Sequence, residues 1–164
     1  MGKLQAPPVS LLDKYRGANF EPIYATRVSV TGGEARHGRA SGTARSEDGE
    51  LDVELRLPVA MGGEGGGTNP EQLFAAGYGA CFHGALHLLA RRHGIDIPDG
   101  SVDVEIAFGR DPVDGWHALT AGVTVRLPGM SLKLAEELVR ATERICPYAK
   151  LVRQGIDCHV RVLV

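Results

Sequence analysis

The stretch TNPEQLFAAGYGACFHGALHLLARRHG, residues 68–94, contains the signals that decide the fold. Asn69 is a good helix N-cap, Pro70 suits the first helical position, and Glu71 places a negative charge where the helix dipole favours one. At the other end, two arginines and a histidine precede Gly94, which is a favourable residue just beyond a helix end. These signals predict one long helix that begins at Pro70 and ends at about residue 93.

Segments in which apolar and polar residues alternate lie on both sides of this helix, as expected for half-buried strands. Three such segments precede it and two follow it, after which come a second helix and a final strand. The order is βββ-α-ββ-α-β. Strands grouped before and after helices favour an α+β fold over a doubly wound parallel sheet. The predicted strands are 23–30, 38–45, 51–57, 102–108, 119–127 and 156–164, and the second helix runs from a cap at Ser131 to Ile145.

The length and composition are those of one globular domain. The chain has 164 residues, of which 43% are apolar and 23% charged. Residues 1–21 show no periodicity and are expected to form an N-terminal arm, which leaves 22–164 as a single domain. Aromatic residues make up only 5% of the chain, so its core is thin and burial across a dimer interface is expected.

Charge and cysteine content exclude several classes of function. With 18 Lys and Arg against 20 Asp and Glu, the net charge is −2, which argues against nucleic acid as a partner. No apolar run approaches the roughly 20 residues of a membrane span, and no signal peptide is evident, so we expect a cytoplasmic protein without membrane contact. Three cysteines in such a protein indicate buried thiols, metal ligands or redox chemistry rather than a disulfide scaffold.

Two of the cysteines are candidates for redox chemistry. Cys81 lies within the long helix among small residues, where a substrate can approach a thiol; the alternative is a buried core cysteine. It lies too far from the helix start to benefit from the dipole, so a reactive Cys81 would need a cation from elsewhere. Cys146 ends the second helix and suits either packing or a resolving thiol. Cys158 alternates with valines and is predicted to lie in the core.

The histidines offer a rival interpretation. His83 and His87 are four residues apart, a spacing that can hold a metal on one helix face. No glutamate follows His83 as in a zinc protease helix, and no third ligand is evident nearby, so a solvated polar face is expected and no metal site is predicted. The glycine-rich loop 61–68 lacks the order of a phosphate-binding loop.

Residues 68–82 closely resemble the first-cysteine motif of the organic hydroperoxide resistance (Ohr) proteins, which belong to the Ohr/OsmC family. The run from Cys146 to Tyr148 resembles their second-cysteine motif, and the likeness extends over residues 22–164. This resemblance implies an OsmC-like fold with antiparallel sheets around central helices. It also implies an intertwined homodimer with active sites at its interface.

The resemblance further implies a thiol peroxidase that reduces organic and fatty-acid hydroperoxides. Cys81 would be the peroxidatic nucleophile and Cys146 the resolving thiol, with Glu71 and an arginine beside the thiolate. Alignment on the sequence Gly-Arg-Ala at 38–40 selects Arg36 as that arginine, and Arg39 is the alternative. The implied reductant is a dithiol such as dihydrolipoamide or a lipoylated protein, with no bound cofactor.

One geometric difficulty arises from the spacing of Glu71 and Cys81. Ten residues of straight helix separate them by about 15 Å. They can share a site only if the helix breaks near Gly77 and Gly79, with the arginine bridging the bend, or if two chains contribute. Two other functions stay open: an OsmC-type peroxidase of broader preference, or a non-catalytic redox-sensing or metal-binding module that uses His83 and His87.

Overall fold

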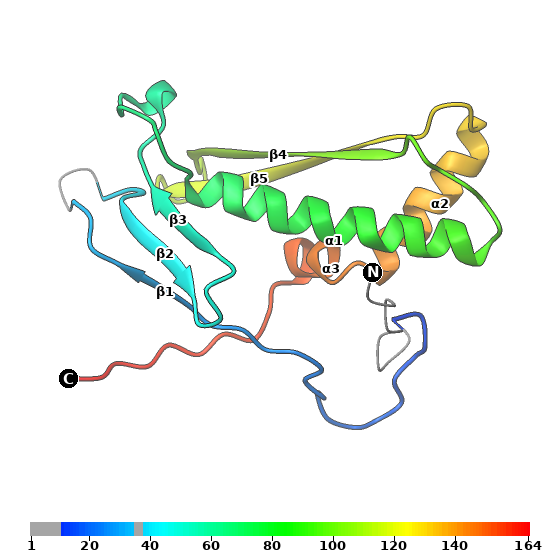
Figure 1. The fold of residues 1–164 in the computed structure, drawn as a ribbon, viewed down its shortest axis with the longest axis horizontal. Helices are drawn as coiled ribbons and strands as arrows, with labels where there is room; N and C mark the ends of the chain where they lie inside the picture. The colour runs from blue at the N-terminus through cyan, green and yellow to red at the C-terminus, as the bar shows by residue number, and fades with distance from the viewer. Residues whose placement is uncertain (1–10, 35–37) are drawn as a thin grey trace.

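The computed structural model describes residues 11–34 and 38–164 and has the α+β architecture predicted from the pattern of strands and helices. Two antiparallel sheets and the two shorter α-helices lie around one long central helix (Figure 1). A single turn of 3₁₀ helix, η1, precedes that helix. The elements are β1 (Val28–Thr31), β2 (Gly42–Ser46), β3 (Asp52–Leu55), η1 (Val59–Met61), α1 (Pro70–Arg92), β4 (Ser101–Arg110), β5 (His117–Arg126), α2 (Leu132–Ile145) and α3 (Pro147–Gln154).

The two sheets occupy different places along α1. The first is the three-stranded meander β1-β2-β3, in which Ala44 of β2 pairs with Val30 on one side and Val53 on the other. It lies at the N-terminal end of α1, whereas the long hairpin β4-β5 runs beside the helix (Figure 1). In that hairpin Phe108 pairs with Leu119. The three strands predicted before the long helix and the two predicted directly after it are confirmed.

Local sequence explains where α1 begins and ends. The Asn69 side chain accepts a hydrogen bond of 2.9 Å from the backbone N–H of Gln72, and Pro70 opens the helix. Gly94 follows the end of the helix with a φ of +68°, a left-handed backbone conformation that strains a residue with a side chain. The helix is continuous through Gly77 and Gly79, so the break that would have brought Glu71 to Cys81 is absent.

The cap at Asn69 provides a test of stability. Replacing Asn69 with Ala removes a buried cap and is expected to destabilise the protein by about 1 kcal/mol. Ser131 occupies the same position before α2, but its side chain makes no cap hydrogen bond, so Ser131→Ala is the matched control. Urea unfolding of both variants measures the difference. Equal midpoints for the two variants would contradict this interpretation of the cap.

Three clusters of buried side chains hold these elements together. One joins the C-terminal half of α1 to α2 around Leu86 and Leu138, and a second surrounds the two thiols where α1, α3 and the hairpin meet. The third joins the meander to the first turn of α1 through Leu55 and Leu73. The meander and α1 are therefore fixed to each other by apolar packing, which positions the loop before β2 beside the start of the helix.

The region after α2 differs from the prediction in two ways. Pro147 was expected to stop a helix; it ends α2 but also opens α3, because a proline is favoured at the first helical position. The final strand predicted at 156–164 is absent: the segment has no strand partner within the described chain and its residues are exposed. Alternation shows that a segment can be half-buried, but a strand also needs a neighbour. Cys158 is accordingly exposed rather than in the core.

The described part of the N-terminal arm contacts the core through Leu12. Leu12 packs against the cluster around Leu86, and the remaining described residues up to β1 are exposed. The first two strands are shorter than predicted and begin at Val28 and Gly42. The division into an arm and one domain stays a prediction.

The hydropathy of α1 corrects one expectation. Among the described residues, α1 is long and apolar enough to cross a membrane by length and composition alone, because its charges lie only near its ends. The same test is passed by the core helices of soluble proteins. Here α1 packs against β4, α2 and α3. The apolar composition of α1 therefore also fits a helix that packs in the core of this fold.

Candidate active site

The structure brings together the two cysteines that the sequence singled out. Cys81 lies in the middle of α1 and Cys146 lies between α2 and α3, 65 residues later, yet their sulfur atoms are 3.5 Å apart. Cys146 is 1% exposed and Cys81 is partly exposed. A thiol pair in contact, with one member accessible, can interconvert with a disulfide after a small movement.

The corner between α2 and α3 places Cys146. Its backbone is extended, its N–H donates to the carbonyl of Thr142, and the Thr142 hydroxyl in turn donates to the carbonyl of Leu138. Pro147 then starts the next helix in a new direction. Cys146 therefore joins the two helices: its N–H donates to a carbonyl of α2, and its own carbonyl accepts from the Lys150 N–H of α3.

The start of α3 also contacts Cys81 directly. The backbone N–H of Tyr148 donates to the Cys81 thiol, and it is the first N–H of α3 because Pro147 has none. An N–H at a helix N-terminus stabilises a thiolate and lowers its pKa. Sequence reasoning missed this group; the signal was Pro147, which marks a helix start.

Burial nevertheless dominates the acidity of Cys81. Desolvation and the neighbouring Cys146 thiol raise the pKa of Cys81 to about 11, and the Tyr148 N–H only partly opposes them. Among the described residues of the single chain, no cation lowers this pKa. In a single chain the Cys81 thiol is therefore mostly protonated at neutral pH.

Aromatic rings surround the thiol pair. Tyr78 and Tyr148 stack with ring centroids 6.2 Å apart, and Phe74 and Phe82 each lie against Tyr78. Gly77 allows this arrangement, because a Cβ at that position would lie 3.1 Å from the Tyr148 hydroxyl oxygen. The surroundings of the thiols are thus largely apolar, and burial raises the pKa of Tyr78 as well.

A second group of candidate residues gathers at the N-terminal end of α1. Arg39 and Glu71 form a partly buried ion pair, and the Arg39 guanidinium carbon lies 4.0 Å from the centroid of the Phe108 ring. Arg36, the arginine selected from the sequence, lies outside the described residues. The structure therefore gives Glu71 the alternative arginine as its partner.

The arginine pair and the thiol pair lie in different places within one chain. Because α1 is uninterrupted, Glu71 and Cys81 are about 15 Å apart along its axis and point in different directions. Of the predicted site residues that the structure describes, Cys81 and Cys146 lie together, and Glu71 lies apart from them within one protomer.

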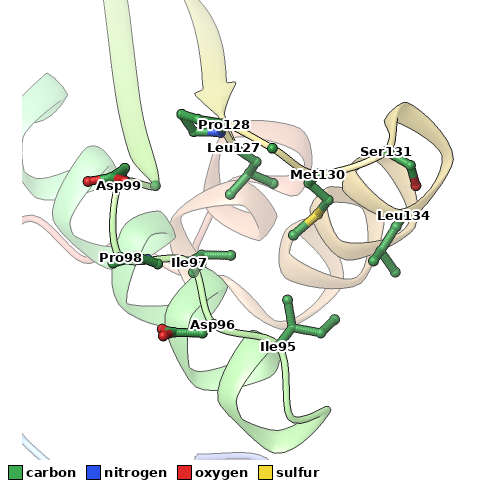
Figure 2. Close-up of a pocket in the computed structure, with 12 residues that line it drawn as sticks. Ile95, Asp96, Ile97, Pro98, Asp99, Leu127, Pro128, Met130, Ser131 and Leu134 are labelled. Atoms are coloured by element: carbon green, nitrogen blue, oxygen red, sulfur yellow. The ribbon is translucent and has the colours of Figure 1, made fainter.

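Other sequence candidates lie away from the thiols. The ring centroids of His83 and His87 are 4.2 Å apart. Within the described ranges, however, no group of three His, Cys, Asp or Glu side chains could hold a metal ion. A cavity of about 350 Å³ lies between the loop after α1 and the loop from β5 to α2, where Ile97 and Met130 face each other (Figure 2). None of the candidate site residues lines it.

Fold and site together define an α+β protein with a contacting dithiol on a central helix and an arginine–carboxylate pair near the start of that helix. The model of the OsmC-like protein family matches residues 63–161, which include both cysteines and Glu71. The chain belongs to the OsmC-like family, and the predicted membership and fold are confirmed.

Relatives with assigned names agree. The organic hydroperoxide resistance protein OhrB of Bacillus subtilis is 36% identical over 82% of this chain and 94% of its own. The organic hydroperoxide resistance protein of Xanthomonas axonopodis pv. citri is 38% identical over 82% and 91%. The crystal structure of an organic hydroperoxide resistance protein from Legionella pneumophila superposes with a TM-score of 0.71, at 36% identity over 84% and 95%. These relatives support a role in peroxide detoxification.

Proposed function

We propose that the protein is a thiol peroxidase that reduces organic, lipid-type hydroperoxides to alcohols. The observation that carries this proposal is the 3.5 Å contact between the Cys81 and Cys146 sulfurs in an apolar, aromatic environment. The names of its relatives supply the substrate class. The apolar rings around the thiols favour a bulky lipid-type peroxide over hydrogen peroxide.

The chemistry follows from the arrangement of the two thiols. The Cys81 thiolate attacks one peroxide oxygen, the O–O bond breaks, and the alkoxide takes a proton to leave as the alcohol. Cys81 becomes a sulfenic acid. The Cys146 sulfur, already in contact, then attacks the Cys81 sulfur, forming the disulfide and releasing water.

The first step requires a thiolate, and within residues 11–34 and 38–164 of one chain no cation lowers the pKa of Cys81. Cys81, whose burial raises its pKa to about 11, needs a cation nearby to form a thiolate. Within one chain, Arg39 is instead held by Glu71 at the start of α1. In this proposal the protein is a homodimer, and the arginine pair of one chain lies beside the thiols of its partner. Arg39 then stabilises the thiolate and the departing alkoxide.

The exposed apolar residues of one chain support a dimer. Val28 and Val30 of β1 are exposed, as are the apolar residues of the C-terminal segment, including Val160 and Val162. Apolar side chains gathered on two extended segments are typical of a surface covered by a partner. An extended segment without a neighbour can also complete a sheet of another chain.

The cycle closes when a dithiol reduces the disulfide. One thiolate attacks a sulfur of the disulfide, and the second thiol of the same molecule displaces the resulting mixed disulfide, which restores both cysteines. Dihydrolipoamide, free or on a lipoylated protein, is the proposed donor, and no bound cofactor is needed. Thiol chemistry of this kind suits the reducing cytoplasm, which is the proposed location.

The resolving role of Cys146 has a direct test. After one equivalent of cumene hydroperoxide, wild type is expected to lose two hydrogens in mass as a disulfide forms. Cys146→Ser is expected to stop at the sulfenic acid, which dimedone traps, because no sulfur then contacts Cys81.

The exposed Cys158 provides the matched control for this experiment. Cys158→Ser removes a thiol of the same type but is expected to form the disulfide as wild type does. Intact mass spectrometry and dihydrolipoamide-dependent turnover check both variants. An intramolecular disulfide in Cys146→Ser, or its loss in Cys158→Ser, would contradict the assignment.

A further inference from the structure

We infer that Phe108 is a positioning residue for the reaction: its ring fixes the orientation of the Arg39 guanidinium. The observation is the guanidinium carbon of Arg39 lying 4.0 Å from the centroid of the Phe108 ring, while Glu71 binds the same group. The inference rests on the proposed function, because it names the residue that holds that function's cation in place.

Arg39 needs side-chain contacts to be held. It lies in the loop between β1 and β2, outside any strand or helix, so ladder hydrogen bonds do not fix its backbone. A guanidinium is planar, and a carboxylate binds its N–H groups in that plane. The ion pair with Glu71 fixes the in-plane position and leaves a tilt about the axis that joins the two groups. A ring at 4.0 Å, against the face, opposes that tilt.

Phe108 is itself held on a rigid element. It lies in β4, the strand that packs against α1, and pairs with Leu119 of β5 across the hairpin. The His117 ring stacks on it with centroids 4.8 Å apart and planes 10° from parallel. The ring is partly buried. The loop residue Arg39 is thus held against the hairpin by Phe108 and against the central helix by Glu71.

Orientation matters because the arginine has to serve a thiolate and a developing alkoxide. Donors that are already aimed at the developing charge stabilise the transition state without reorganisation, whereas a tilting guanidinium loses part of that effect. The Phe108 ring would therefore affect the peroxide step and not the reduction of the disulfide, in which Arg39 has no proposed part.

The test compares Phe108→Leu, which keeps an apolar side chain without a ring, with Phe108→Tyr, which keeps the ring. Phe108→Leu is expected to lower kcat/KM for cumene hydroperoxide about tenfold, and Phe108→Tyr to stay within about twofold of wild type. The rate of disulfide reduction by dihydrolipoamide is expected to be unchanged in both. Ile106→Leu, on the same face of β4, is the control for general damage to the strand.

A second measurement separates positioning from packing. The Arg39 Nε–H resonance, assigned by its loss in Arg39→Lys, is expected to carry a ring-current shift that disappears in Phe108→Leu and persists in Phe108→Tyr. In an Arg39→Met background, Phe108→Leu is expected to cause no further loss of kcat/KM, since the group it positions is gone.

The outcomes distinguish this inference from the proposed function. If Phe108→Leu has the activity of wild type, or if its loss is the same in the Arg39→Met background, the positioning role is wrong although the peroxidase stands. If wild type itself lacks peroxidase activity, the proposed function is wrong. The ring-current shift of the Arg39 Nε–H resonance then still tests whether Phe108 contacts Arg39. An unshifted Arg39 resonance in wild type overturns the inference in either case.

Discussion

Cys81→Ser is expected to abolish peroxide reduction, lowering kcat/KM for cumene hydroperoxide by at least about a thousandfold. The hydroxyl of serine stays protonated at any accessible pH and cannot replace a thiolate as nucleophile toward an O–O bond. The change is nearly isosteric, so the aromatic shell around the site should persist. Peroxide consumption with dihydrolipoamide as donor measures the loss.

The control for Cys81→Ser is the thiol that lies outside the site. Cys158→Ser should keep wild-type turnover, because Cys158 is exposed and is not part of the contacting pair. The thermal midpoint of Cys81→Ser should also stay near that of reduced wild type. Retained turnover in Cys81→Ser would leave the family motif without its nucleophilic role, and His83 and His87, whose rings lie against each other, would become the next residues to test.

The second large effect is expected from Arg39→Met, with a loss of about 100- to 1,000-fold in the rate of Cys81 oxidation. Methionine fills a similar volume without the charge that stabilises the thiolate. The pKa of Cys81 should then rise toward the value of about 11 that burial and Cys146 impose in a single chain. The pH dependence of alkylation by iodoacetamide measures this: the variant should need a higher pH to reach the rate that wild type reaches.

Mixed dimers show which chain supplies the arginine. Cys81→Ser and Arg39→Met are each expected to be inactive, yet chains of both kinds, unfolded together and refolded, should regain about a quarter of wild-type activity. Half of the dimers are then mixed, and each mixed dimer has one site with both an intact thiol pair and an intact arginine in trans. No recovery would place the arginine in the same chain as the thiols.

Arg36→Met is the matched variant for the arginine assignment. Arg36 was preferred from the sequence, whereas Arg39 is the arginine that contacts Glu71. If Arg36→Met shows the larger loss, the sequence alignment identified the functional cation and the Arg39 pair is structural.

Most of the fold could be predicted from local patterns. The caps around Pro70 and Gly94 fixed the central helix to within a residue, and alternation fixed the meander and the hairpin, because both signals act between near neighbours in the chain. The strand predicted at 156–164 was wrong because alternation indicates which residues can be buried but does not indicate which neighbour would cover them.

The candidate site could be predicted only in part. The two cysteines were found as a pair through their motifs, but their contact depends on Pro147 starting a helix that turns Cys146 toward α1, and a proline is consistent with both a stop and a start. The choice between Arg36 and Arg39 depends on the path of a loop, which no local rule encodes. The contact of Phe108 with Arg39 joins residues 69 positions apart and left no signal in the sequence.

The distance between the cysteines along the chain has a consequence for the energetics of turnover. A bond between Cys81 and Cys146 would close a loop of 65 residues and tie the central helix to the corner between α2 and α3. Loop closure of this length removes enough entropy from the unfolded chain to stabilise the folded one by about 4 kcal/mol. The oxidised half of the cycle would therefore be the more robust form, so that exposure to peroxide itself protects the protein from unfolding until a dithiol releases the cross-link.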